Sequence, residues 1–217
     1  MLYTFTERQV VYMNHVITIG RELGSGGRTV GKEVAKRLEV PYYDRELIDE
    51  AAKESGLSAD FIENNEQEIT SSFLYNLAMG NSYTYGMLGL GGTNSMPLTM
   101  QVFLAQQKVI QKYAASPCVI VGRCADYILK EYKPFRIFVY ADIDSKIKRC
   151  REKGPEHENL TDRELKQKIS GMDKKRAKYY ELYTGHSWGD KLNFDLCINT
   201  SRTVIKEIVP AVAKLLV

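Results

Sequence analysis

The stretch "GRELGSGGRT", Gly20 to Thr29, carries the residue types with the clearest chemical use. It follows a short β-branched run, "HVITI", and precedes "TVGKEVAKRL", in which apolar residues recur at helical spacing. A glycine loop between a strand and a helix presents backbone N–H groups, and the helix N-terminus adds partial positive charge, so phosphate groups can bind there. The sequence therefore predicts a phosphate-binding loop. Its expected nucleotide-binding residues are Gly24, Ser25, Gly26, Gly27, Arg28 and Thr29.

The loop departs from the common pattern G-x-x-x-x-G-K-[ST]. With Gly27, Arg28 and Thr29 in register, the leading glycine becomes Glu22 and the lysine becomes Arg28. Thr29 then stands where a hydroxyl group would bind Mg²⁺. Arginine keeps the charge of lysine and can bind phosphate through two parallel hydrogen bonds, but it is bulkier and planar. We expect Arg28 to act on the phosphates; the alternative is a turn that merely closes a strand onto a helix.

Strand and helix patterns alternate along the rest of the chain. Apolar, β-branched runs predict strands at 15–19, 40–44, 118–122, 136–142 and 194–198, with helical patterns between them. Such alternation is typical of an α/β fold with a parallel sheet. Because strand carboxyl ends meet at one edge of a parallel sheet, residues that directly follow the strands are candidates for a shared site.

One long segment interrupts this alternation. Residues 57–97 combine many glycines with aromatic residues, and they interrupt what otherwise reads as one domain over 14–217, preceded by an extension at 1–13. Long loops in compact domains often cover a substrate, so we expect a mobile substrate-side insertion. A disordered surface insertion is the alternative.

The amino-acid composition limits the classes of protein to which the chain can belong. The chain has 217 residues, 44% of them hydrophobic and 26% charged, with a net charge of +3, as in an ordinary globular protein. The four cysteines lack metal-site spacing, and no apolar run approaches the ~20 residues that span a bilayer, so we expect a cytoplasmic protein without a membrane partner. Acidic residues balance the basic ones between 146 and 178, and we therefore expect no nucleic-acid partner.

The segments "VITIGRELGSGGRTVGKEVAKRL", "YYDRELID", "CVIVGRCADYIL" and "RIFVYADIDSKIKR", followed by "DKKRAKYYELYTG", "WGD" and "FDLCINTS", resemble the cytidylate kinase-like family over residues 14–217. The resemblance implies a three-layer α/β/α P-loop kinase fold, with a five-stranded parallel sheet in the order 2-3-1-4-5 and a basic lid at 150–180. It also implies ATP and Mg²⁺ as cofactors and a small nucleotide, such as CMP or dCMP, as acceptor.

The resemblance also assigns residues. Asp44 and Arg45 match the start of the acceptor-binding segment, although Asp44 could instead cap the next helix. Arg123 matches an arginine that grips the acceptor's phosphate, with a surface arginine as the alternative. The lid residues implied as catalytic, together with Arg28, are Arg149, Asp173 and Arg176, against the alternative of a solvated helix face.

Two departures from the family pattern keep other functions open. The usual arginine shortly after Asp44 is missing, since Ile48, Asp49 and Glu50 stand there, so a different small acceptor is credible. The missing loop lysine also fits a nucleotide-binding sensor with little or no kinase activity.

Overall fold

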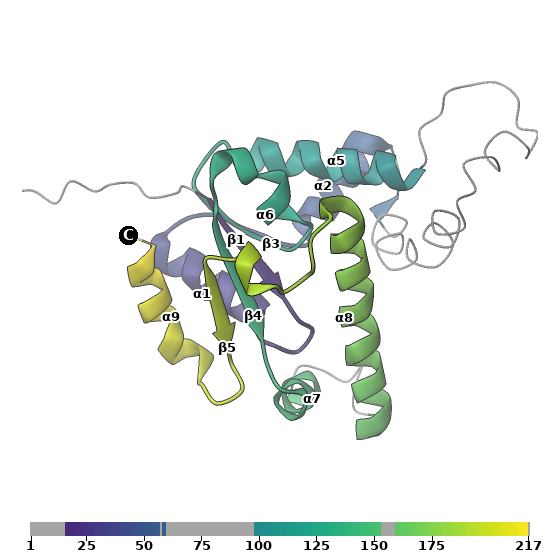
Figure 1. Ribbon diagram of the computed structural model, residues 1–217. Coiled ribbons are helices and arrows are strands. Elements are labelled where there is room, and N and C mark those ends of the chain that lie inside the picture. The colour runs from purple at the N-terminus through teal and green to yellow at the C-terminus, as the bar shows by residue number, and fades with distance from the viewer. Residues whose placement is uncertain (1–15, 57, 60–97, 153–158, 217) are drawn as a thin grey trace, which may run out of the picture.

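The computed structural model describes residues 16–56, 58–59, 98–152 and 159–216 (Figure 1). The predicted extension at 1–13 lies outside these ranges, as does the predicted insertion at 57–97 except for residues 58 and 59. Of the predicted lid region, only 153–158 is outside the described residues. The division of the chain into these segments stays a prediction.

Five parallel strands form one sheet in the order β2-β3-β1-β4-β5, which confirms the predicted order. The strands are β1 (Val16–Arg21), β2 (Tyr42–Tyr43), β3 (Cys118–Val121), β4 (Phe135–Tyr140) and β5 (Leu196–Asn199). β2 is shorter than the predicted 40–44. Pro41 has no N–H to pair, and only its carbonyl joins the sheet, accepting from the Val119 N–H over 2.9 Å.

Helices connect the strands (Figure 1). They are α1 (Gly27–Leu38), α2 (Glu46–Ser55), α5 (Leu98–Tyr113), α6 (Ala125–Ile128), α7 (Ile143–Glu152), α8 (Asp162–Thr184) and α9 (Ile205–Leu215), with short 3₁₀ turns at Lys130–Tyr132 and Lys191–Asn193. Within the described ranges, none of these helices is both long and apolar enough to cross a membrane.

The helices cover both faces of the sheet, which confirms the three-layer α/β/α prediction. Side chains alternate between the faces of a strand, so Ile17 and Ile19 of β1 join the core with α1 and α9. Val16 joins the opposite core, with α2, α5 and α6. The two cores hold β1 rigidly in the centre, and the loop that follows it starts from a fixed point.

The strand register brings the carboxyl ends of the central strands to one edge. Ile19 of β1 stands opposite Val121 of β3 and Ile137 of β4, and Arg21 stands opposite Val139. The segments after these strands are those in which the sequence places its candidate residues. The fold therefore gathers them at the edge where ligands bind in open α/β sheets.

α8 is the long helix at the right of Figure 1, and it begins at a capping box, which the spacing of Thr161 and Glu164 in the sequence predicts. The Thr161 hydroxyl accepts from the Glu164 N–H, and the Glu164 carboxylate accepts from the Thr161 N–H over 2.8 Å. Near this end the helix buries Leu165 and Ile169 beside Cys150 of α7. Its other end packs against α5, so α8 is anchored at both ends.

Replacing the capping residue should weaken α8 measurably. We expect Thr161→Ala to lower the free energy of unfolding by about 1 kcal/mol, because one N–H of the first turn loses its acceptor. Thr203→Ala is the matched control, since Thr203 is exposed and outside the helices. Urea unfolding of both variants measures the difference; an equal effect in the two would contradict the capping role.

Candidate active site

The loop between β1 and α1 is shaped by its own residues. Gly24 and Gly26 adopt left-handed backbone conformations, with φ of 77° and 83°, which residues with side chains rarely adopt. The buried Ser25 hydroxyl donates to the Glu22 carbonyl over 2.8 Å and accepts from the Gly27 N–H over 3.3 Å. The predicted nucleotide-binding residues thus form a continuous turn into the helix.

The first turn of α1 provides donors for an anion. Gly26 is the N-cap, and the helical hydrogen bonds begin with the Val30 N–H, which donates to the Gly26 carbonyl over 3.0 Å. The N–H groups of this first turn precede that bond, and the first N–H groups of a helix have no acceptor within the helix. Together with the helix dipole they fit a phosphate group. The half-buried Thr29, the predicted metal-binding residue, lies in this turn.

The rear of the loop is fastened to β5 and α7. Thr200, directly after β5, donates from its hydroxyl to the Ser25 carbonyl over 2.7 Å. Arg149 of α7 donates to the carbonyls of Gly24 and Ser25 over 3.4 and 3.5 Å, and also to the Thr200 carbonyl. The predicted residue Arg149 therefore reaches the loop, and it contacts the loop's backbone oxygens.

An ion cluster, which we call the loop clamp, joins the loop to α7 and α8. The buried Lys146 ammonium lies 2.6 Å from a Glu22 carboxylate oxygen and 3.0 Å from one of Asp173. The second Asp173 oxygen accepts from the Leu23 N–H over 2.7 Å. The predicted residue Asp173 therefore binds the loop backbone. Lys146 and Glu22 were not predicted, because a basic residue in a charged helix gives no sign of which carboxylates it will meet.

Asp44 lies at the mouth of the loop, on the side of β2 and α2. One of its oxygens lies 2.6 Å from Arg28 Nε, and the other lies 3.6 Å from Arg21 Nη2. Asp44 is buried, whereas the Arg28 side chain is 61% exposed. The N-cap of α2 is Arg45, without a side-chain capping bond, so the capping alternative for Asp44 is wrong. The structure pairs the predicted residues Arg28 and Asp44.

Arg21 and Arg28 contact this carboxylate, and Arg176 and Arg123 add further positive charge near these two arginines. Burial, the largest cause, and the charges of Arg21, Arg28 and Arg123 together lower the pKa of Arg176 to about 9, against the opposing effect of Asp173. A guanidinium remains charged at neutral pH, so this shift measures the free-energy cost of holding the charge there. Arg176 also donates to the Arg21 carbonyl over 3.3 Å. The cluster has more positive than negative charge and favours an anionic ligand.

The predicted acceptor-side arginine, Arg123, sits in a strained turn after β3. Gly122, Arg123 and Cys124 all have left-handed backbones, with φ of 78°, 61° and 53°. Non-glycine residues in this conformation cost roughly 1–3 kcal/mol each and cluster at functional sites. Arg45, the other predicted arginine of the acceptor side, is exposed at the start of α2.

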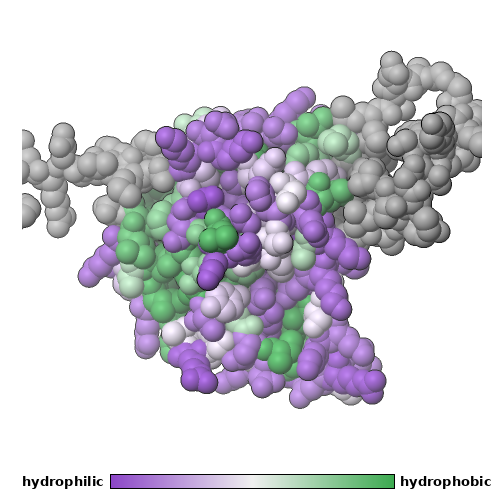
Figure 2. Space-filling model, viewed as in Figure 1, coloured by the Kyte–Doolittle hydropathy of each residue, from purple (hydrophilic) through white to green (hydrophobic). Residues whose placement is uncertain are grey.

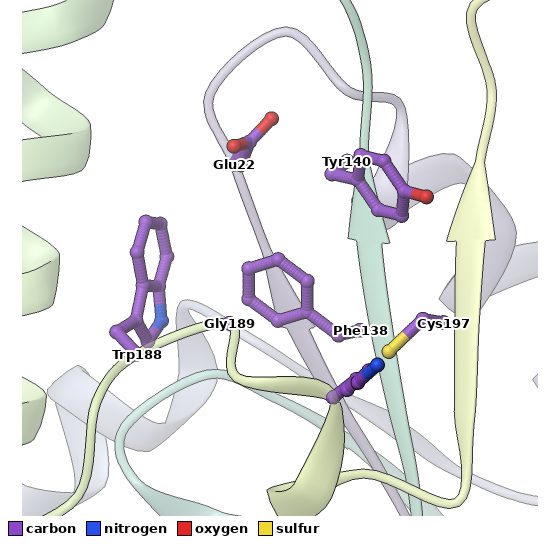
Figure 3. Close-up of a pocket in the computed structure, with 7 residues that line it drawn as sticks. Glu22, Phe138, Tyr140, Trp188, Gly189 and Cys197 are labelled. Carbon is purple, nitrogen blue, oxygen red and sulfur yellow. The ribbon is translucent and has the colours of Figure 1, made fainter.

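A separate cavity of about 260 Å³ opens beside the loop, over β4 and β5 (Figure 3). Phe138 and Tyr140 of β4 line it with Trp188, whose ring packs edge-on against Phe138 with centroids 5.3 Å apart. Glu22 is its link to the loop clamp. Trp188 is therefore a packing residue in the wall of this cavity. On the surface shown in Figure 2, hydrophilic residues cover most of the face, and the apolar residues form separate patches.

Metal binding would depend on the nucleotide. Within the described residues, no three His, Cys, Asp or Glu side chains gather into a metal-binding group. Mg²⁺ is commonly held by one or two protein oxygens together with substrate phosphates and water. Thr29 and Asp44, at the N-terminus of α1 and after β2, offer oxygens of this kind.

The sequence of this site is shared with a known family. The model of the "Cytidylate kinase-like family" matches residues 16–202. The chain belongs to the cytidylate kinase-like family. The resemblance drawn from its motifs is therefore confirmed, and no curated protein matches the chain.

Solved structures share the fold of this family member. An uncharacterized protein from Eubacterium ventriosum ATCC 27560 has a TM-score of 0.64 and 25% identity, over 93% of this chain and 97% of that one. A shikimate kinase from Bacteroides thetaiotaomicron has a TM-score of 0.53 and 17% identity, with coverage of 93% and 97%. A shikimate kinase from Acinetobacter baumannii, in complex with shikimate, has a TM-score of 0.50 and 14% identity, with coverage of 94% and 93%. The chain has a kinase-like fold related to cytidylate and shikimate kinases.

Removing the cation of the loop clamp should destabilise the protein. Lys146→Met leaves two neighbouring carboxylates without their shared partner, and we expect a loss of about 3 kcal/mol, at the lower end for a buried pair because Glu22 is 25% exposed. Lys148→Met is the matched control, since Lys148 is exposed on the same helix. Chemical denaturation measures both.

The expected pH dependence of the clamp follows from Lys146. Burial lowers the pKa of Lys146, but the bonds to Glu22 and Asp173 outweigh this effect and raise it overall. Its contribution to stability is therefore complete below the ordinary lysine pKa and declines as the pH rises through the raised value. If Lys146→Met lowered the free energy of unfolding at neutral pH no more than Lys148→Met does, the stabilising role of the clamp would be contradicted.

The arginine cluster should make the protein respond to polyvalent anions. We expect sodium tripolyphosphate to raise the thermal unfolding midpoint more than sodium chloride at equal ionic strength, because a bound anion offsets the repulsion among the arginines. When the tripolyphosphate concentration is about 100 times its Kd, binding should raise the free energy of unfolding by about 2.7 kcal/mol. Arg176→Gln should lose most of this shift, and Arg163→Gln, an exposed arginine near the start of α8, should retain it. Equal shifts by both salts would contradict an anion site.

Proposed function

We propose that this protein is an ATP-dependent phosphotransferase that moves the γ-phosphoryl group to a small acceptor bearing an anionic group. A nucleoside monophosphate such as CMP or dCMP is the first candidate. The observation that carries the proposal is the arginine cluster beside the glycine loop, in which Arg21 and Arg28 contact Asp44. Membership of the cytidylate kinase-like family supports it.

The glycine loop fits the donor side of this reaction. Bound MgATP supplies the transferable phosphoryl group and the metal ion that neutralises part of its charge. The N–H groups of the first turn of α1 would hold the phosphates, and the Thr29 hydroxyl would bind the metal ion. The loop clamp and Arg149 would act as positioning groups, because they contact the backbone of the loop.

The segments after β2 and β3 fit the acceptor side. Arg123 would bind the acceptor's anionic group, and the exposed Arg45 borders the same side of the site. The buried Asp44 carboxylate can accept a hydrogen bond from an acceptor hydroxyl or from a metal-bound water molecule. Arg176 would stabilise the negative charge of the group in transfer. Catalysis would then come from positioning and charge neutralisation, as in other phosphoryl-transfer enzymes.

A screen of acceptors with MgATP tests the proposal. We expect ADP formation that depends on an acceptor, with CMP, dCMP and UMP tried first and other phosphorylated or carboxylated metabolites next. Asp44→Asn should lower kcat/KM at least tenfold, because the amide has no charge with which to accept a hydrogen bond from an acceptor hydroxyl or a metal-bound water molecule. Asp144→Asn is the matched control, because Asp144 is exposed in the first turn of α7.

The outcomes of the screen separate the alternatives. If the pyrimidine monophosphates all fail and another acceptor turns over, the phosphotransferase proposal stands and the cytidylate acceptor is wrong. If calorimetry detects ATP binding but no acceptor is phosphorylated, the protein is a nucleotide-binding sensor. Loss of transfer in Arg28→Ala would link turnover to the loop.

A further inference from the structure

Arg21 and Gly27 occupy one shared space at the base of the loop. Arg21 ends β1, and its side chain crosses the start of α1. A Cβ atom added to Gly27 would lie 2.4 Å from Arg21 Cβ and 3.1 Å from Arg21 Cγ. Gly27 begins the helix without a left-handed backbone, so its own conformation does not require glycine. The Arg21 side chain therefore excludes a lysine at Gly27.

The Arg21 guanidinium continues from there toward the ends of β3 and β2. A Cβ atom on Gly122 would lie 2.1 Å from Arg21 Nη1, so the guanidinium lies directly against the turn after β3. The side chain is 13% exposed. It lies between the first turn of α1, which fits the donor phosphates, and the strained turn that carries Arg123. A cation there is next to both sides of a phosphoryl transfer.

Some of the buried polar atoms at this guanidinium make no hydrogen bond. Arg21 Nε is buried and makes no hydrogen bond, and the same is true of Asp44 Oδ1. These two side chains approach to 3.6 Å, which is longer than a hydrogen bond, and Arg28 takes the other Asp44 oxygen at 2.6 Å. Asp44 is itself only 6% exposed. Buried charged groups of this kind cost free energy unless a ligand completes their hydrogen bonds.

Arg28 is placed differently. It is 61% exposed and engaged with Asp44, so it can hold that carboxylate without reaching the base of the loop. Arg21 is the deeper of the two cations, and its stem borders Gly27, the first residue of α1 and the one directly before Arg28.

We infer that Arg21 binds the phosphoryl group at this site and replaces the lysine that the loop lacks, while Arg28 positions Asp44. The inference rests on the proposed function in taking a phosphate as the ligand. Two phosphates have the required chemistry: the γ-phosphate of the donor and the acceptor's own phosphate.

Calorimetric titrations of Arg21→Gln distinguish these two sources. The probes are a non-hydrolysable ATP analogue, ADP and CMP, each with Mg²⁺. A contact to the γ-phosphate predicts that the analogue binds about 10- to 100-fold more weakly while ADP is unchanged, as expected for a lost charge-assisted hydrogen bond. A contact to the acceptor predicts the same loss for CMP alone. Arg163→Gln, with the same change of charge at an exposed position, should leave all three affinities within about threefold.

A residue swap tests the shared space directly and remains informative if Arg21→Gln does not fold. Gly27→Lys alone should bind the ATP analogue weakly, because the new side chain meets Arg21. Arg21→Gly combined with Gly27→Lys should restore binding to within about fivefold of the original chain. Thermal unfolding of each variant shows whether it is folded.

The results bear separately on the inference and on the proposed function. Unchanged affinities in a folded Arg21→Gln, or a combined variant no better than Gly27→Lys, would overturn the role of Arg21. If Arg21→Gln weakens binding but the original chain transfers phosphate to no acceptor, the inference holds and the phosphotransferase proposal fails. An original chain that binds none of the probes would overturn both.

Discussion

Lys146 holds two carboxylates from distant parts of the chain, Glu22 of the loop and Asp173 of α8, and the geometry of the site depends on this interaction. The second oxygen of Asp173 binds the Leu23 N–H, so the backbone just after β1 is fixed to α7 and α8 at once. The residue before this clamp, Arg21, directs its guanidinium toward the turn after β3. The successive residues Arg21, Glu22 and Leu23 thus connect the loop to most of the elements around it.

The site accumulates unfavourable features that a ligand would relieve. Four arginines share a small region with Asp44, and the turn after β3 holds Arg123 and Cys124 in left-handed conformations. Folding tolerates these costs because the two apolar cores on either side of the sheet fix the strands independently of the site. Repulsion among like charges and incomplete hydrogen bonds are typical of sites that bind phosphate with preformed groups.

The parts of the site that were predictable depend on local sequence. The glycine loop, the capping box at Thr161 and the placement of Arg123 after a strand follow from short-range patterns, and the structure contains all three. Partners could not be predicted in the same way. The ion pair of Arg28 with Asp44 and the contact of Asp173 with Leu23 join residues far apart in the chain, and charge alone does not select among many possible partners.

By itself, the sequence determined the alternation of strands and helices, the glycine loop and the membership of the cytidylate kinase-like family, because hydrophobic periodicity and glycine spacing are local properties. Only the tertiary structure decided which cation lies at the base of the loop. Sequence register favoured Arg28, but the Arg21 side chain fills the space beside Gly27 and leaves Arg28 exposed next to Asp44. The physical reason is steric: two side chains cannot occupy one volume, and that volume exists only once β1, α1 and β3 have packed together.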